Sequence, residues 1–148
     1  MIAVRRETAA DAEAVWRVLA DGWLYPSWVV GASRMRDVDE GWPAVGTMLH
    51  HSVGAWPALI NDTTSVTGCV PGRELMLRGR LWPLGEADIR LRLEPNGDAG
   101  GGCTITMEED VASGPTKLLP KPVRTAMIVP RNVEALRRLI YLAEGRSR

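Results

Sequence analysis

Three side chains that can exchange protons fall on one predicted side of three strands: His51, Asp62 and Glu109. Alternate residues of an extended strand face the same side of the sheet. By this rule His51 shares its side with the apolar Leu49, and Glu109 shares its side with Met107. An imidazole beside a carboxylate can act as a general acid–base pair, for example to remove a proton next to a carbonyl group.

His51 is the best general base of such a pair, because an imidazole with an unperturbed pKa of about 6.5 accepts a proton near neutral pH. Asp62 or Glu109 would then orient the ring and stabilise the imidazolium. His50 falls on the opposite side of the same strand. The alternative is that these side chains lie at the rim of a cavity or form structural pairs. A one-residue bulge would also reverse the side assigned to His51 or Asp62.

Motifs of several other reaction types are missing from the sequence. There is no G-x-S-x-G nucleophile motif, no G-x-G-x-x-G dinucleotide motif and no P-loop. The two cysteines, Cys69 and Cys103, form no C-x-x-C pair and no zinc-type cluster with histidine. We therefore expect two free, buried cysteines in a reducing compartment, no bound metal and no cofactor. The alternative is a disulfide between neighbouring strands, which needs an oxidising compartment.

The inward side of the predicted strands is otherwise apolar, which is typical of a site for an apolar molecule. Trp28 lies close to Pro26 in a segment expected to close one end of a cavity, and Trp56 precedes Pro57 in a loop. Such loop tryptophans either form an aromatic rim or anchor the loop on the sheet. The predicted ligand-contacting residues are Trp28, Leu49, Trp56, Leu77, Leu91, Met107 and Met127.

The order of the predicted elements is a strand, two short helices, six strands and a long helix. The first strand spans residues 2–8, and helical spacing of apolar residues follows over 12–20, then a short helix or turn within 23–30. Short β-like runs separated by Gly, Pro, Asn and Asp predict the remaining strands at 32–39, 46–54, 59–70, 73–81, 86–94 and 103–112.

The last segment is predicted to be a helix that covers the sheet. Its apolar residues recur at spacings of three and four and form one stripe. The residues of this stripe are Val129, Val133, Leu136, Ile140 and Ala143. In the predicted strands 73–81 and 86–94, arginines alternate with inward leucines and therefore face the outer side of the sheet. We expect these arginines to form cross-strand ion pairs with Asp88, Glu108 and Asp110.

Composition limits the class of protein. The chain has 148 residues, 45% of them apolar, which fits one domain over residues 1–148. Lys and Arg number 18, as do Asp and Glu, so the net charge is zero and a nucleic-acid partner is not expected. No apolar run is long enough to span a membrane and no secretory signal is evident, so we expect a cytoplasmic protein. We expect either a monomer or a homodimer, and the sequence does not distinguish them.

The element order, together with several short motifs, resembles the helix-grip fold of the START/SRPBCC superfamily, and more closely its bacterial polyketide cyclase/dehydrase-like branch. The resemblance is carried by the opening strand and helix over 2–20 and by four short motifs: 23–28 (WLYPSW), 45–47 (VGT), 53–57 (VGAWP) and 71–77 (PGRELML). The strands 85–93 and 103–111 and the final helix complete it. The resemblance implies an α+β fold in which a curved antiparallel sheet of about seven strands wraps around a long C-terminal helix, with a ligand cavity between them. It implies no particular reaction.

Three functions from different classes remain open. The leading hypothesis is the binding of a hydrophobic small molecule, either a lipid or a polyketide-like aromatic, in this cavity. The first alternative is an enzyme of the cyclase or dehydratase type that uses His51, Asp62 and Glu109. The second is a stress-related interaction protein that uses the exterior of the sheet.

Overall fold

The computed structural model describes residues 1–148 except 55–56, 82–84, 98–100 and 147–148. Seven antiparallel strands form one sheet in the order β1-β7-β6-β5-β4-β3-β2. The strands are β1 (Ile2–Thr8), β2 (Ala32–Val38), β3 (Met48–Val53), β4 (Ile60–Val70), β5 (Glu74–Leu81), β6 (Gly85–Pro95) and β7 (Cys103–Ser113). Every predicted strand is present, with boundaries that differ by two residues at most.

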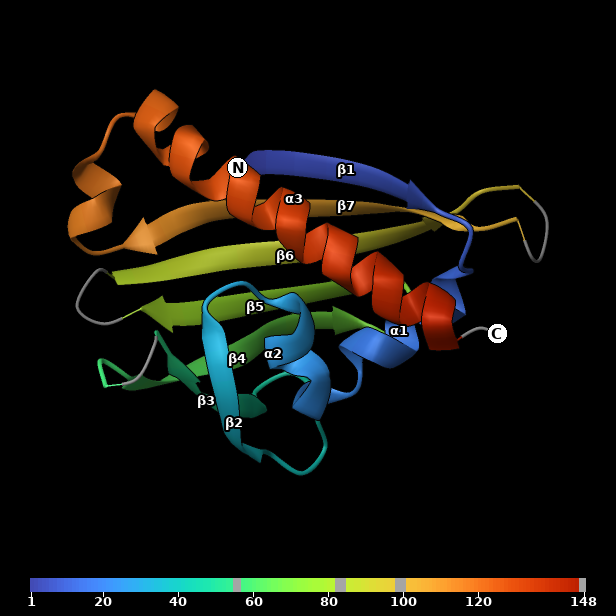
Figure 1. Cartoon of the computed structure of the whole chain (residues 1–148), viewed down its shortest axis with the longest axis horizontal. Coiled ribbons are helices and arrows are strands. Elements are labelled where there is room, and N and C mark those ends of the chain that lie inside the picture. Colours follow the sequence, from blue (N-terminus) through green and yellow to red (C-terminus); the bar gives the residue numbers. More distant parts are fainter. Residues whose placement is uncertain (55–56, 82–84, 98–100, 147–148) are drawn as a thin grey trace.

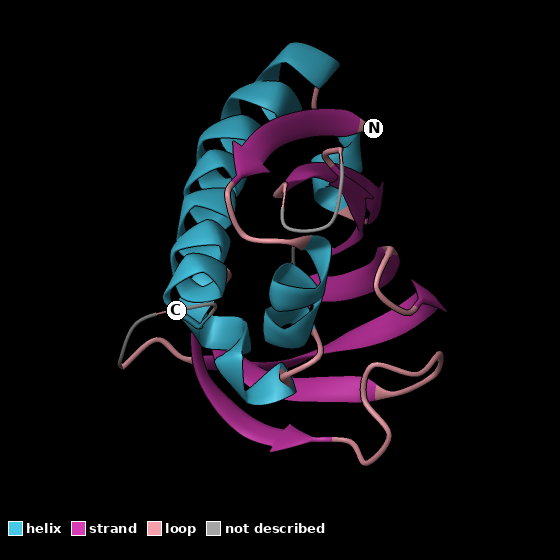
Figure 2. Cartoon of the chain, turned by 90° about the vertical axis from the view of Figure 1, so that its right-hand side faces the viewer, coloured by secondary structure: helices cyan, strands magenta, loops and turns pink. Residues whose placement is uncertain are grey.

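The helices are α1 (Ala12–Leu19), α2 (Tyr25–Trp28) and α3 (Lys121–Arg146), with the short 3-10 turns η1 (Gly22–Leu24) and η2 (Pro115–Leu118). They lie on one side of the sheet, whose strands curve around them (Figure 2). The long helix α3 runs obliquely across that side (Figure 1). A single sheet face with its apolar side chains needs such a cover, and this arrangement confirms the helix-grip fold.

Local sequence explains where α1 begins and which face it buries. The Asp11 side chain accepts a hydrogen bond from the Ala14 backbone N–H at 2.8 Å, which satisfies one of the free donors at the helix start. The buried residues Ala14, Val15, Val18 and Leu19 follow at helical spacing. Trp16 is partly buried and packs against the edge of the core.

The strands alternate as predicted between a buried and a charged side. Leu75 and Leu77 of β5 and Leu91 of β6 are at most 1% exposed. On the outer side Arg78 contacts Asp88 at 2.8 Å, and Arg92 pairs with Glu108. The predicted cross-strand pairs at Asp88 and Glu108 are therefore confirmed.

The outer-face prediction was wrong for Asp110. This carboxylate pairs with Arg124 of α3, since β7 is followed by η2 and the chain returns over the end of the strand. Strand alternation does not show such a contact, because it compares only residues within the sheet.

The buried stripe of α3 is rotated from the predicted one. Leu136 and Ala143 are fully buried as expected, but Val129, Val133 and Ile140 are only partly buried. The face centre is instead formed by Ile128, Asn132, Ala135 and Leu139, all 7% exposed or less. The helix is apolar over an arc wider than one stripe, so spacing alone left its rotation uncertain by about one residue, or 100°.

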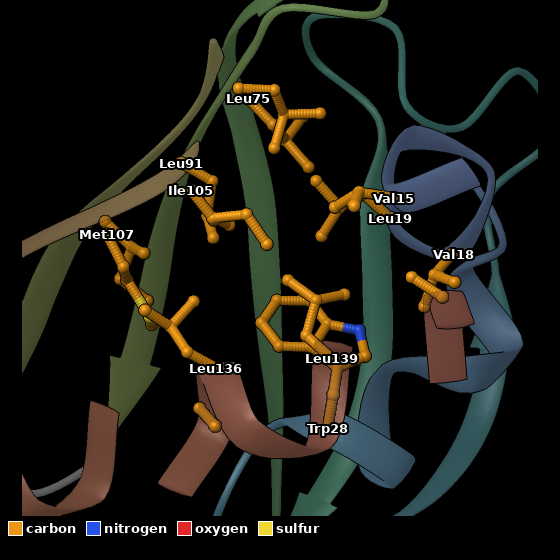
Figure 3. Close-up of a cluster of buried hydrophobic side chains, with 14 of the residues drawn as sticks. Val15, Val18, Leu19, Trp28, Leu75, Leu91, Ile105, Met107, Leu136 and Leu139 are labelled. Carbon is orange, nitrogen blue, oxygen red and sulfur yellow. The ribbon is translucent and has the colours of Figure 1, made fainter. Parts of the chain in front are cut away.

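The tightly packed core lies over one half of the sheet. Leu75, Leu91 and Ile105 from the strands meet Leu136 and Leu139 of α3 and the buried face of α1, and Trp28 lies beside them (Figure 3). These residues come from the end of the sheet where β5 and β7 begin and β6 ends. The other end, under the N-terminal half of α3, is less completely filled, and it holds the candidate site.

Candidate functional site

Four residues with small or short side chains form a row across the sheet, here called the short-side-chain row: Thr64, Gly79, Ala87 and Val111. They are successive register partners on β4, β5, β6 and β7. Larger residues at these positions, like the leucines of the packed half, would reach the helices. Two pockets lie along this row, and both are lined by Ala87 and by Arg131 of α3.

The larger pocket, the outer pocket, has a volume of about 260 Å³ and lies between the ends of β6 and β7, η2 and the N-terminal half of α3. Its walls are mostly apolar and include Ala87, Val111, Leu119, Met127 and Ile128. A concave apolar surface with a few polar groups is the usual form of a small-molecule site.

Glu109 and Arg131 form an ion pair in the outer pocket, whose other polar lining residues are Glu86, Thr116 and Arg124. Arg131 donates from Nη2 to both carboxylate oxygens of Glu109 at 2.8 Å. Glu109 is only 2% exposed. Its burial raises the pKa of the carboxyl above its ordinary value, and Arg131 and the Asn132 amide oppose that rise. Glu109 is thus held by a cation on the helix and not by an imidazole.

The smaller pocket, the inner pocket, has a volume of about 80 Å³ and is lined by Tyr25, His51 and Thr64 together with Gly79, Ala87 and Arg131. His51 Nε2 and Thr64 Oγ1 are 2.8 Å apart, and the Tyr25 hydroxyl lies 3.1 Å from the same oxygen. His51 is 3% exposed, and its Nδ1 has no hydrogen-bond partner among the described residues.

The environment of His51 keeps the imidazole neutral. Burial lowers its pKa below the ordinary value, Asp62 opposes this shift, and the electrostatic influence of Arg36 and His50 adds to it. Burial also raises the pKa of the Tyr25 phenol, which keeps this hydroxyl protonated. Both groups therefore enter the site as uncharged hydrogen-bonding groups at neutral pH.

Asp62 is buried beside His51 as its register partner on the neighbouring strand. Its carboxylate accepts a hydrogen bond from the Thr63 backbone N–H at 2.9 Å, and Arg80 Nε lies 4.0 Å from it. The side chain of Arg36 donates to the backbone oxygens of both His51 and Asp62. These contacts surround the strand pair with positive charge.

The structure thus places all three predicted acid–base residues on the inward side, but it does not bring them together as a hydrogen-bonded set. His51 contacts Thr64 and Glu109 contacts Arg131. His50 points to the outer side, as predicted, and forms a 2.8 Å contact with Asp39.

The predicted ligand-contacting residues are distributed between the core and the pockets. Leu49 and Leu91 are fully buried in the packed core and line neither pocket. Trp28, Leu77 and Met107 surround a void of about 20 Å³, which fits little more than a water molecule. Met127 lines the outer pocket and is 55% exposed. Trp56 lies outside the described residues.

Sequence reasoning missed Tyr25, Thr64, Gly79, Ala87 and Arg131 as site residues. Strand alternation placed Thr64 and Gly79 on the inward side, so short inward residues among leucines were the available signal. Tyr25 and Arg131 gave no comparable signal. Their positions depend on how α2 and α3 cross the sheet.

The described residues were also compared with the requirements of a metal site and of a membrane-spanning helix. They contain no group of three or more His, Cys, Asp or Glu side chains placed to hold a metal ion. Cys69 and Cys103 are both free thiols. In the described part of the chain, no helix has the length and apolar character needed to cross a membrane.

Comparison with known families gives the class of the protein. Residues 1–143 match the model of the family described as "Polyketide cyclase / dehydrase and lipid transport". The chain therefore belongs to this family, and the resemblance noted in the sequence is confirmed. A search of curated proteins finds no match.

Solved structures share the fold over nearly the whole chain. A protein from Nitrosomonas europaea, NE0264, is 16% identical with a TM-score of 0.73, over 98% of this chain and 94% of that one. The Zhui aromatase/cyclase from Streptomyces sp. R1128 is 20% identical with a TM-score of 0.71, over 99% and 94%. The di-domain aromatase/cyclase StfQ of the steffimycin pathway is 12% identical with a TM-score of 0.71, over 99% of this chain and 51% of that one. These similarities show the helix-grip fold.

Proposed function

We propose that this protein binds a small, mostly apolar aromatic molecule along the short-side-chain row, between the sheet and the N-terminal half of α3. The observation that carries the proposal is the outer pocket, whose apolar walls end at the Glu109–Arg131 pair. An apolar ring buried there gains the hydrophobic contribution of its surface, and the polar pair fixes its orientation.

The size of the pockets favours an aromatic of one or two rings over a long-chain lipid. Sites for drug-sized ligands enclose roughly 300–1,000 Å³. The outer pocket measures about 260 Å³ and the inner pocket about 80 Å³. The space beyond them is occupied by the packed core, so a long chain would have to displace buried leucines.

Membership of the family and the fold of the aromatase/cyclases support an aromatic, polyketide-like ligand. The geometry favours binding over acid–base catalysis. A general base must reach a proton and needs a pKa near the working pH, whereas burial lowers the pKa of His51 and its ring contacts a hydroxyl group. The outer side of the sheet carries ion pairs such as Arg78–Asp88, which does not favour an apolar partner surface there.

Ligand-observed NMR with 2-methylnaphthalene tests the proposal, because this probe has two rings and no polar group. Val111→Phe places a ring in the outer pocket, and we expect it to weaken binding about tenfold or more through steric overlap. Val70→Phe is the matched control, because Val70 is 49% exposed and lines neither pocket. Absence of binding to the wild type, or equal binding by both variants, would contradict the proposal.

A further inference from the structure

The polar network of the inner pocket has one more donor proton than it has internal hydrogen bonds. Tyr25, Thr64 and neutral His51 carry one hydroxyl or N–H proton each, which makes three in all. Only two contacts join them, Tyr25–Thr64 and Thr64–His51. Whichever way the protons point, one donor is left over without an acceptor among the three groups.

Which group carries the spare donor depends on the proton arrangement, but all three residues line the inner pocket. If Tyr25 donates to Thr64 and Thr64 donates to His51 Nε2, the spare donor is the N–H at His51 Nδ1, which has no partner among the described residues. In the other arrangements it is the Tyr25 or the Thr64 hydroxyl. Leaving a buried donor unpaired costs free energy, so the network favours an acceptor in this pocket.

Arg131 of α3 offers a second hydrogen-bond donor to the inner pocket. Arg131 lines both pockets, and its hydrogen bonds to the described residues use only Nη2. The guanidinium carries further N–H groups. Its positive charge also favours the negative end of a carbonyl dipole or a carboxylate.

The space for an acceptor is present because position 79 is a glycine. A Cβ atom added to Gly79 would meet only Thr64 Oγ1 at 3.8 Å and Ile89 Cδ1 at 4.0 Å, both ordinary contacts. A side chain would therefore fit where the inner pocket now lies. Gly79 lines the inner pocket and does not line the outer one.

We propose that the inner pocket binds an acceptor oxygen of the ligand, a ketone or carboxylate oxygen attached to the aromatic ring, while the ring occupies the outer pocket. Tyr25, Thr64 and His51 supply one donor, and Arg131 supplies another. Ala87 and Arg131 line both pockets, so the proposal places one rigid molecule across the two. This inference rests on the proposed function and names the chemistry of its ligand.

Three probes with the same ring system test it: 2-acetylnaphthalene, 2-naphthoate and 2-methylnaphthalene. An added hydrogen bond makes the two oxygen-bearing probes bind about three- to tenfold more tightly than the hydrocarbon. Preference for the ketone or for the acid identifies which oxygen the site takes. Equal affinity for all three overturns the inference and leaves the proposed function standing, whereas no binding of any probe overturns both.

Gly79→Val tests the place of the oxygen. The added side chain fills the inner pocket, so the preference for oxygen-bearing probes should vanish while the affinity for 2-methylnaphthalene changes less than about twofold. His50→Gln on the opposite side of β3 should keep the preference. A preference that survives in a folded Gly79→Val variant overturns the inference.

Ring-nitrogen NMR of the wild type gives a second readout that needs no substitution. The chain has two histidines, so His50 serves as an internal control. We expect the His51 nitrogen resonances to shift with 2-acetylnaphthalene and not with 2-methylnaphthalene, while those of His50 stay constant. A His51 response that is the same for both probes, together with equal affinities, contradicts the inferred contact. Unchanged His51 resonances with tighter binding of 2-acetylnaphthalene assign the donor to Tyr25 or Thr64.

Discussion

The burial of His51 gives the protein a pH dependence of known sign. Because burial lowers its pKa in the folded state, the unfolded chain binds this proton more tightly. Stability is therefore expected to fall as the pH drops below the unfolded pKa of about 6.5, by no more than about 1.4 kcal/mol per pH unit for one proton. Urea titrations between pH 7.5 and 5.5 measure this slope.

His51→Phe removes the titrating group while keeping a ring, and we expect it to flatten the slope between pH 7.5 and 5.5. His50→Gln is the control and should retain the part of the slope that His51 contributes, because this side chain lies on the outer side against Asp39. A slope that is unchanged in His51→Phe would mean that His51 titrates alike in the folded and unfolded chains.

Removal of the Arg131 charge leaves the Glu109 carboxylate buried without its cation. We expect Arg131→Met to lower the free energy of unfolding at pH 7 by about 1–3 kcal/mol. Burial already raises the pKa of Glu109, so the folded state binds its proton more tightly than the unfolded state. The loss should therefore shrink as the pH falls toward 4.5, the ordinary value for this group.

Arg137→Met is the matched control for this variant. Arg137 belongs to the same helix and pairs with Glu134 at 2.8 Å, but its side chain is 75% exposed. Exposed pairs contribute little, and we expect a much smaller loss than in Arg131→Met. Equal losses in the two variants would show that the Glu109–Arg131 pair is no more important than a surface pair.

At the residue scale, the sequence predicted which way the strand side chains point but not what they contact. Alternation with Leu49 placed His51 inward, and the same rule placed Asp62 and Glu109 inward. The partners Thr64 and Arg131 depend on strand register and on helix rotation. Neither quantity is encoded in local spacing, so an acid–base set was the reasonable but incomplete hypothesis.

At the scale of elements, β6 separates a buried side from a solvated one. Leu91 is fully buried, and Leu91→Ala should lower the free energy of unfolding by about 2–5 kcal/mol, because it removes a core side chain and leaves a cavity. The neighbouring Arg90 faces the outer side and contacts Glu74 at 2.9 Å. Arg90→Ala should cost about 0.5 kcal/mol or less in the same denaturant titration.

The comparison of these two variants tests the side assignment of the whole strand. A loss of unfolding free energy below about 0.5 kcal/mol for Leu91→Ala would contradict the assigned side. Truncation of a fully buried leucine leaves unfilled space or forces the neighbouring side chains to repack. Similar losses for both variants would point to a general effect on β6 and not to a difference between its two sides.

The strands were predictable to within two residues, whereas the buried face of α3 was not. Period-two alternation has only two solutions, and the charged arginines of β5 and β6 exclude one of them. The helix has many rotations, and Val129 and Ile140 compete with Ile128 and Leu139 for the centre of its face. Only packing against the curved sheet decides between them.

At the scale of the whole molecule, the fold divides into a packed half and a half with space for a ligand. α1 and the C-terminal part of α3 cover the packed half, where leucines fill the interior. The short-side-chain row underlies the other half, together with η2 and the N-terminal part of α3. The element order predicted this architecture, but the location and small size of the pockets follow from side-chain volumes along the row.

The most direct test of the account is an NMR measurement of which methyl groups contact a bound probe. The six isoleucines are Ile2, Ile60, Ile89, Ile105, Ile128 and Ile140. Ile128 lines the outer pocket, Ile89 lines the inner pocket, and Ile105 is buried in the packed core. With 2-acetylnaphthalene bound, we predict nuclear Overhauser contacts from the ring protons to Ile128 and from the acetyl methyl to Ile89, and none to Ile60. Contacts to Ile60 or Ile2 without Ile128 would place the ligand elsewhere and contradict the proposed site.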